Sequence, residues 1–124
     1  MKPQFIIGAA SSGSGKTTFT MGLLRALGHR GMRVQPYKCG PDYIDTQFHS
    51  LASKQVSVNL DTWLASEEHV RSLYHSYGKD ADVCTVEGVM GLYDGYSGMK
   101  GSSAAMAALL DIPVILLVNA RSTA

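Results

Sequence analysis

The sequence contains few cysteines and no excess of either charge. Its two cysteines, Cys39 and Cys84, lie far apart and form no CxxC pair, which argues against a disulfide framework and a zinc site. Eleven Lys and Arg residues stand against ten Asp and Glu residues, so the formal net charge at pH 7 is +1. A balance of this kind gives no basis for binding nucleic acid. Because the cysteines indicate no disulfide framework, we expect a protein of the reducing cytoplasm.

Long apolar runs are also missing. The longest run, at 114–118, has the length of a strand, whereas a membrane-spanning helix needs about 20 residues. Near the amino terminus, the apolar run at 5–7 is shorter than the core of a secretory signal. We therefore expect no membrane association. The 124 residues fit one domain, and their end just after a strand-like segment leads us to expect a fragment of a longer protein.

Strand and helix patterns alternate along the chain. Apolar runs predict strands at 4–8, 32–38, 81–87 and 112–118, and helical spacing with capping residues predicts helices at 16–27, about 46–53, 66–78 and 102–110. Pro36 predicts that the second strand lies at a sheet edge or ends there. The alternation predicts an α/β fold with a mostly parallel sheet flanked by helices, in which the strands' carboxyl ends share one edge.

The segment GAASSGSGKTT, residues 8–18, joins the first predicted strand to the first predicted helix. The backbone N–H groups of such a loop, at the positive end of a helix dipole, form a cradle for phosphate. The segment departs from the GxxxxGK[ST] pattern because Ala10 occupies the first glycine position. We predict that Lys16 reaches the β- and γ-phosphates and that Thr17 binds Mg²⁺. The predicted nucleotide-binding residues are Ser12, Gly13, Ser14, Gly15, Lys16, Thr17 and Thr18.

Acidic residues follow two other predicted strands at the same edge. Glu87 ends the third strand, and Asp42 and Asp45 follow the second strand in the segment GPDYID. Carboxylates at this edge are candidates for holding Mg²⁺ beside the phosphates. Each has an ordinary alternative, which is a solvated strand end for Glu87 and turn chemistry for the two aspartates.

Other residues carry weaker signals. Lys38 ends the second predicted strand, where it is either a cation beside the γ-phosphate or a solvated lysine. Asp94 by itself indicates a turn in a glycine-rich loop. The four histidines lack the spacing of a metal site, and we expect each to be a structural residue at the surface or partly buried. We expect Trp63 in the core or a pocket wall, and Gly22 to permit close helix packing.

Five segments resemble the amino-terminal synthetase domain of the cobyrinic acid a,c-diamide synthase family of cobalamin biosynthesis. They are SSGSGKTTFTMGLLRAL, RVQPYKCGPDYIDTQFH, NLDTW, VEGVMGLYDG and IPVILLVNA, which occur in the family's order. GSGKT alone indicates only a P-loop, whereas YKCGPDYIDT and VEGVMGLYDG together are far more selective. The resemblance implies a P-loop NTPase fold similar to that of dethiobiotin synthetase.

The resemblance implies an ATP- and Mg²⁺-dependent ligase that amidates the a- and c-carboxylates of cobyrinic or hydrogenobyrinic acid. The γ-phosphoryl group of ATP would pass to a substrate carboxylate, and ammonia derived from glutamine would attack the resulting acyl phosphate. By their places in the family's motifs, the metal-side residues are Thr17, Asp42 and Glu87. The residues implied in catalysis or substrate positioning are Lys16, Lys38, Tyr43, Asp45 and Asp94.

The family also has a carboxyl-terminal glutaminase domain with a cysteine nucleophile. Neither Cys39 nor Cys84 lies on a tight strand-to-helix turn of the kind that presents such a nucleophile. The resemblance therefore implies that residues 1–124 form the amino-terminal part of the ATP-binding synthetase domain. Ammonia would come from a glutaminase domain that is absent from this chain.

Three other P-loop classes remain as alternatives. Dethiobiotin synthetase lacks the GPDYIDT and EGVMGLYDG pair, and cobyric acid synthase has a segment resembling FKxQNM where this sequence has YKCGPDY. Partitioning-type ATPase switches carry a second lysine five positions before the main one, where this sequence has Ser11. Without that second cation a nucleotide-sandwich dimer loses its main electrostatic basis.

Overall fold

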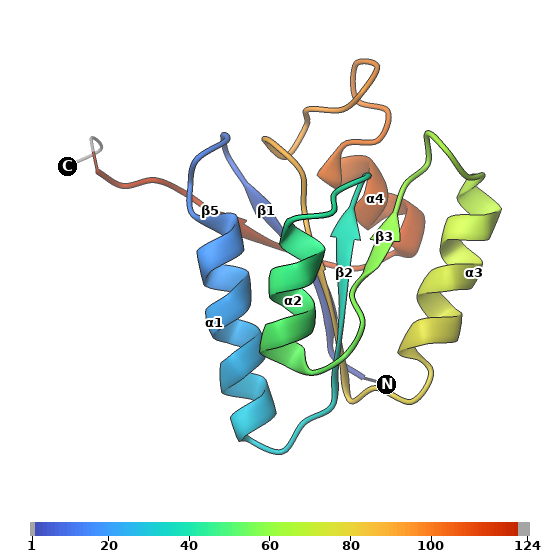
Figure 1. Ribbon diagram of the computed structural model, residues 1–124. Helices are drawn as coiled ribbons and strands as arrows, with labels where there is room; N and C mark the ends of the chain where they lie inside the picture. The colour runs from blue at the N-terminus through green and yellow to red at the C-terminus, as the bar shows by residue number, and fades with distance from the viewer. Residues whose placement is uncertain (1, 122–124) are drawn as a thin grey trace.

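The computed structural model describes residues 2–121 and contains a five-stranded sheet with helices on both faces (Figure 1). The strand order is β3-β2-β4-β1-β5, and every neighbouring pair is parallel. The strands are β1 (Gln4–Ala9), β2 (Val34–Cys39), β3 (Val58–Leu60), β4 (Val83–Glu87) and β5 (Val114–Leu117). The predicted α/β fold with a parallel sheet is confirmed.

The described helices are α1 (Lys16–His29), α2 (Asp45–Ser53), α3 (Glu67–Gly78) and α4 (Ser103–Leu110). The four predicted helices are confirmed within two residues at each end. Ser66 and Ser102 cap α3 and α4, because their hydroxyls accept the N–H groups of His69 and Ala105. At α1 the capping position is Gly15, which has no side chain to offer, so the first N–H groups of α1 remain available to an external anion.

The sequence prediction missed β3. This strand has three residues and pairs only with the end of β2, where Tyr37–Cys39 lie opposite Val58–Leu60. A run of this length is too short to show an alternating pattern. The strand therefore exists because β2 offers a free edge, which is a tertiary cause.

The prediction that Pro36 marks an edge strand or a strand end is wrong, because β2 lies between β3 and β4. β2 pairs with β4 over Val34–Lys38, whereas its pairing with β3 begins only at Tyr37. The Gln35 side-chain amide donates to both the Pro36 carbonyl and the Val56 carbonyl just ahead of β3. Pro36 therefore faces a gap before β3 begins, where the N–H that proline lacks is not needed.

Apolar side chains fill a layer on each face of the sheet. The helices α1 and α2 cover one face, where Leu24 and Ala52 join Val34 and Val83 in a buried cluster. The helices α3 and α4 cover the other face, whose larger cluster includes Ile6, Tyr37, Val70, Tyr74, Val86 and Met106. The apolar run of β1 is covered on both faces, as such runs predict. The same expectation is wrong for β5, an edge strand in which Val114, Ile115 and Leu116 are 38–47% exposed.

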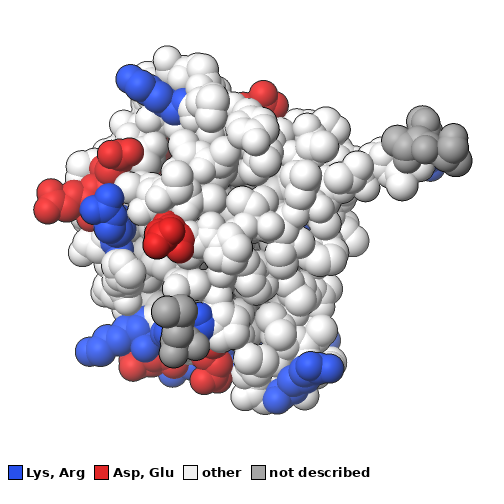
Figure 2. Space-filling model, turned by 180° about the vertical axis from the view of Figure 1, so that it is seen from behind, with Lys and Arg blue, Asp and Glu red and all other residues white. Residues whose placement is uncertain are grey.

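The carboxyl ends of β1, β2 and β4 meet at one edge of the sheet, at the top of Figure 1. Three loops follow these ends and lie at that edge, namely 10–15, 40–44 and 88–102. Seen from behind, Lys and Arg lie among Asp and Glu near the margins, and most of the surface between them is uncharged (Figure 2). In the described part of the chain, no helix combines the length and apolar character needed to cross a membrane.

Candidate functional site

The loop between β1 and α1 forms the predicted cradle. Gly13 and Gly15 have φ angles of 78° and 84°, a left-handed conformation that glycine adopts without strain. A turn within the loop is closed by the Ser14 hydroxyl, which donates to the Ser11 carbonyl at 2.9 Å. Six of the seven predicted nucleotide residues line a cleft of about 390 Å³, and Ser14 is the exception. The six are Ser12, Gly13, Gly15, Lys16, Thr17 and Thr18.

The side chain of Lys16 spans this cleft. Its Nζ atom donates to the Met90 carbonyl at 2.9 Å, in the loop that follows β4. Met90 has a φ of 46°, which is an unfavourable left-handed conformation for a bulky residue. Burial and the charge of Lys38 lower the pKa of Lys16. The lysine therefore joins the cradle to the loop after β4.

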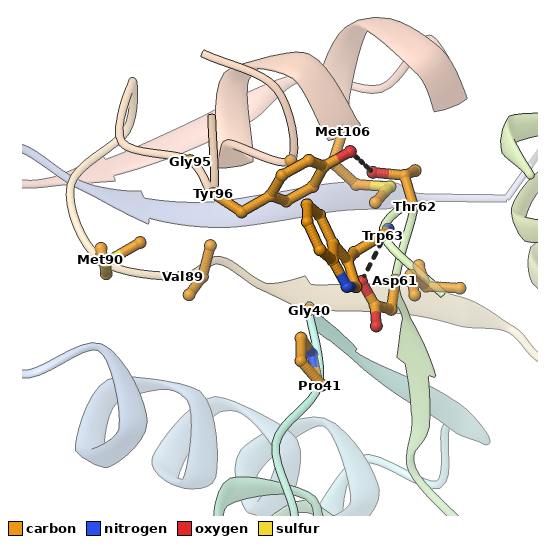
Figure 3. A pocket seen from close by; sticks show the side chains of 12 residues that line it. Gly40, Pro41, Asp61, Thr62, Trp63, Val89, Met90, Gly95, Tyr96 and Met106 are labelled. Carbon is orange, nitrogen blue, oxygen red and sulfur yellow. Dashed lines mark hydrogen bonds between the residues drawn. The ribbon is translucent and has the colours of Figure 1, made fainter. Parts of the chain in front are cut away.

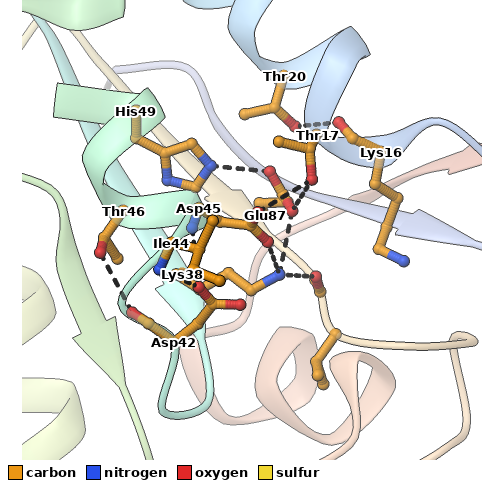
Figure 4. Close-up of polar contacts among 12 residues, drawn as sticks. Lys16, Thr17, Thr20, Lys38, Asp42, Ile44, Asp45, Thr46, His49 and Glu87 are labelled. Carbon is orange, nitrogen blue, oxygen red and sulfur yellow. Dashed lines mark hydrogen bonds and ion pairs between the residues drawn. The ribbon is translucent and has the colours of Figure 1, made fainter. Parts of the chain in front are cut away.

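Glu87 is the centre of the polar cluster beside the cradle (Figure 4). It is 1% exposed, and both of its oxygens are engaged. Oε1 lies 2.7 Å from His49 Nε2, and Oε2 lies 3.0 Å from both Thr17 Oγ1 and Lys38 Nζ. Burial opposes ionisation, but the hydrogen bond from His49 and the charge of Lys38 outweigh it and lower the pKa of Glu87 to about 2. The solvated strand-end alternative is therefore excluded.

Lys38 is likewise buried, at 4% exposure, so the solvated alternative is excluded for it too. Its Nζ lies 3.0 Å from Asp45 Oδ2 and from Glu87 Oε2, and donates to the Gly88 carbonyl at 2.9 Å. Burial lowers the pKa of Lys38, but the charges of the two carboxylates outweigh it and raise this pKa overall. Asp45 Oδ1 also accepts from the Thr17 hydroxyl at 3.3 Å. The structure thus brings Thr17, Lys38, Asp45 and Glu87 together.

Asp42 lines the same cleft but has a further task. Its Oδ1 accepts the backbone N–H groups of Ile44 and Asp45, each at 2.8 Å. This is the turn chemistry of the ordinary alternative, and it fixes the entry into α2. Within the predicted metal-side set, Thr17 contacts Glu87 directly, whereas the aspartate that Thr17 contacts is Asp45 and not Asp42.

Two predicted positioning residues lie outside the cleft lining. Tyr43 is 78% exposed. Asp94 is exposed, and its Oδ2 accepts the Gly91 N–H at 3.1 Å within a turn of the glycine-rich loop after β4. The structure does not bring either side chain to the cluster around Glu87.

His49 is the site residue that the sequence prediction missed. We predicted a surface or partly buried histidine, but His49 is fully buried and both ring nitrogens are engaged. Nδ1 lies 3.1 Å from Ser57 Oγ, while Nε2 faces Glu87. One signal was present in the sequence, since Asp45 directly precedes the helix predicted at about 46–53 and stands four residues before His49. The two residues share a face because α2 begins at Asp45.

The donors at this cluster suit a hard cation such as Mg²⁺, because they are one hydroxyl and two carboxylates. Among residues 2–121, no three His, Cys, Asp or Glu side chains are grouped as a metal site. Mg²⁺ is often held by one or two carboxylates together with substrate phosphates and water. The residues present therefore fit a metal ion that arrives with a nucleotide.

A glycine-rich loop leading into a helix at the carboxyl edge of a parallel sheet defines a P-loop nucleotide-binding domain. A sequence model of the family described as the CobQ/CobB/MinD/ParA nucleotide binding domain matches residues 5–122. The chain belongs to this family.

Curated relatives confirm the resemblance that the motifs indicated. The chain is 51% identical over 119 residues to a cobyrinate a,c-diamide synthase of Dehalococcoides mccartyi, covering 94% of this chain and 26% of the relative. It is 49% identical over 122 residues to a hydrogenobyrinate a,c-diamide synthase of Streptomyces coelicolor, covering 97% of this chain and 25% of the relative. The chain thus spans about a quarter of the length of these relatives.

A solved structure resembles the fold. The signal recognition particle receptor FtsY of Elizabethkingia anophelis, in complex with GDP, superimposes with a TM-score of 0.62 and 17% sequence identity. The match covers 94% of this chain and 40% of that one. At this identity the likeness concerns the fold alone.

Proposed function

We propose that the chain provides the ATP site of an enzyme that amidates the a- and c-carboxylates of cobyrinic or hydrogenobyrinic acid. The observation that carries the proposal is the convergence of Thr17 from the P-loop and Lys38 from β2 on the buried carboxylate of Glu87, each at 3.0 Å. The names of the relatives supply the substrate class.

The proposed reaction activates a substrate carboxylate, which has no usable leaving group of its own. A carboxylate oxygen attacks the γ-phosphorus of ATP, the bond to the bridging oxygen breaks, and ADP leaves. Ammonia then attacks the acyl carbon, inorganic phosphate departs, and the nitrogen loses a proton to give the amide. Such phosphoryl transfer depends on positioning and charge neutralisation more than on covalent help from the protein.

Residues of this chain provide that positioning. The N–H groups of the cradle and Lys16 would hold the β- and γ-phosphates. Lys38 would neutralise charge at the transferring group, and its contacts with Asp45 and Glu87 fix its ammonium in place beforehand. Bound Mg²⁺ would offset phosphate charge, held by Thr17 and Glu87 with Asp42 or Asp45. Tyr43 and Asp94 stay proposed as residues that position the substrate.

Glutamine hydrolysis is assigned to another domain of the whole protein. Both cysteines of this chain are buried, and burial raises the pKa of each thiol, to about 12 for Cys39. Such thiols are poor nucleophiles at neutral pH. We therefore propose that residues 1–124 belong to the synthetase domain and receive ammonia from a separate glutaminase domain.

The proposal is tested with the full-length protein, ATP, Mg²⁺ and cobyrinic acid, with either glutamine or ammonium chloride as the nitrogen source. Mass spectrometry of the corrinoid should show two amidations and matching release of ADP and phosphate. Stimulation of ATP turnover by diaminopelargonic acid with CO₂, and none by cobyrinic acid, would replace the proposal with a dethiobiotin synthetase-like ligase. ATP-dependent dimerisation or binding to DNA or vesicles, without amidation, would instead favour a partitioning-type switch.

A further inference from the structure

A second pocket, of about 350 Å³, opens beside the phosphate cleft (Figure 3). Its walls come from the segment after β3, the loop after β2, the loop after β4 and one side chain of α4. Two aromatic side chains, Trp63 and Tyr96, form much of one side, and Trp63 is therefore a pocket-wall residue. The predicted nucleotide and metal residues take no part in this pocket, so the function described so far leaves it unexplained.

The aromatic pair is held in place although it is open to solvent. Trp63 and Tyr96 are 66% and 45% exposed, and their ring centroids lie 5.0 Å apart in an edge-to-face arrangement. The Tyr96 hydroxyl lies 3.1 Å from Thr62 Oγ1, and the backbone N–H of Trp63 donates to Asp61 Oδ1 at 3.0 Å. The Tyr96 ring packs directly on Gly101, where an added Cβ would come within 2.2 Å of the ring. Large aromatic surface exposed to solvent beside a pocket is typical of a binding site.

The pocket and the phosphate cleft adjoin each other. Val89 and Met90 line both of them. The Met90 carbonyl is also the group that accepts from Lys16 Nζ, at 2.9 Å. A ligand that packs in the pocket would therefore have one edge beside Lys16, at the place where the γ-phosphate is expected.

Charged groups lie on both the cleft side and the pocket side. On the cleft side, Lys38 is paired with Asp45 and Glu87, whereas the Lys16 ammonium donates to the Met90 carbonyl and forms no ion pair with a carboxylate among residues 2–121. On the pocket side, Asp61 Oδ2 is buried and has no hydrogen-bond partner among residues 2–121. An acidic ligand is repelled by this carboxylate and attracted by the Lys16 ammonium, so its reacting carboxylate would face Lys16 at the phosphate cleft.

We propose that this pocket binds an apolar part of the corrinoid ring system, with Trp63 and Tyr96 packed against the ring and one rim carboxylate directed over Val89 and Met90 to the phosphate cleft. The inference rests on the proposed function. A corrinoid combines a broad apolar macrocycle with carboxylates at its rim, which matches aromatic walls next to the Lys16 ammonium. The pocket volume is at the low end for enclosing a ligand, so it takes one portion of the ring and leaves the rest outside.

The test uses the full-length protein and cobyrinic acid. Trp63→Ala should raise KM for cobyrinic acid about 10-fold or more, because an aromatic contact at the centre of a site is lost, while KM for ATP stays within about twofold. Trp63→Phe should have a smaller effect of the same kind. The matched control is Tyr77→Ala, an aromatic residue of α3 that is 50% exposed and should leave both constants unchanged.

A binding measurement covers the case in which Trp63→Ala does not fold. Trp63 is the only tryptophan of the 124 residues, and the difference in emission between wild type and Trp63→Phe isolates its signal in the whole protein. Cobyrinic acid should quench this difference signal at the concentrations that saturate the reaction.

Amidation by the wild type, together with an unchanged KM in Trp63→Ala and no quenching, would overturn the proposed role of the pocket and leave the proposed function intact. A Trp63 signal that is already shielded from acrylamide without substrate would show that another part of the protein covers the pocket, which also overturns it. Absence of amidation by the wild type would instead refute the proposed function.

Discussion

His49 Nε2 lies 2.7 Å from Glu87 Oε1, so a buried histidine of α2 is hydrogen-bonded to the buried glutamate that ends β4. Because this contact occupies one carboxylate oxygen, the other oxygen is directed to Thr17 and Lys38. We therefore predict that His49 is a positioning residue that acts through Glu87. Outer contacts of this kind set the orientation of the groups that hold metal ions and phosphates.

Replacing His49 should weaken the reaction through Glu87. His49→Ala removes the donor to Oε1, and we expect kcat to fall about 10- to 100-fold with a higher Mg²⁺ concentration at half-maximal rate. His49→Gln places an amide N–H near the Nε2 position, whereas His49→Asn reaches only the Nδ1 position. We therefore expect substantial recovery of kcat and of the Mg²⁺ midpoint in His49→Gln but not in His49→Asn. Equal losses in both variants would indicate a purely structural histidine.

Lys16→Ala should abolish amidation even when ammonium replaces glutamine, because we place Lys16 in carboxylate activation and not in ammonia supply. The measurement is corrinoid amide formation at saturating ammonium chloride. Lys79→Ala is the matched control, since Lys79 is an exposed lysine just after α3. Ammonium-dependent product at more than a small fraction of the wild-type rate would contradict the role given to Lys16.

Asp42→Asn separates the two tasks of Asp42. The asparagine retains an Oδ1 that can accept the Ile44 and Asp45 N–H groups, so α2 should stay intact while the charge is lost. If Asp42 helps to hold Mg²⁺, the Mg²⁺ concentration at half-maximal rate should rise by about 10-fold in this variant. Glu87→Gln should shift it as well, because it alters the acceptor of Thr17. An unchanged Mg²⁺ titration would remove the variant residue from the metal-side set.

Two glycines should respond in opposite ways to alanine. An added Cβ at Gly88 would meet Ser103 Oγ at 2.4 Å and the Ile7 carbonyl at 2.8 Å, so Gly88→Ala should destabilise the fold by about 1–3 kcal/mol. A Cβ added at Gly22 would have no atom within 4 Å of it apart from the neighbouring backbone of α1. The interpretation that Gly22 permits close helix packing is therefore wrong. Gly22→Ala should therefore stabilise α1 by about 1 kcal/mol. Chemical denaturation of both variants would measure the difference, and equal effects would contradict this account.

Most of the fold was predictable because its signals are local. The glycines of the P-loop, the serines ahead of α3 and α4, and the apolar runs of the long strands each indicate an element within a few residues. The site was predictable in part for the same reason, since strand ends of a parallel sheet share one edge and Lys38 and Glu87 both stand at such ends. The roles given to these residues remain predictions.

The sequence by itself determined the P-loop, the parallel α/β fold and the residues that reach the phosphate edge, because backbone conformation and apolar periodicity are properties of neighbouring residues. Only the tertiary structure decided which strands pair and which side chains contact one another. It paired the three-residue β3 with β2, grouped Asp45 with the buried Lys38 and Glu87, placed His49 behind Glu87 and left Tyr43 and Asp94 outside the cleft. Contacts between groups tens of residues apart depend on how strands and helices pack, and that packing is set by the whole core at once.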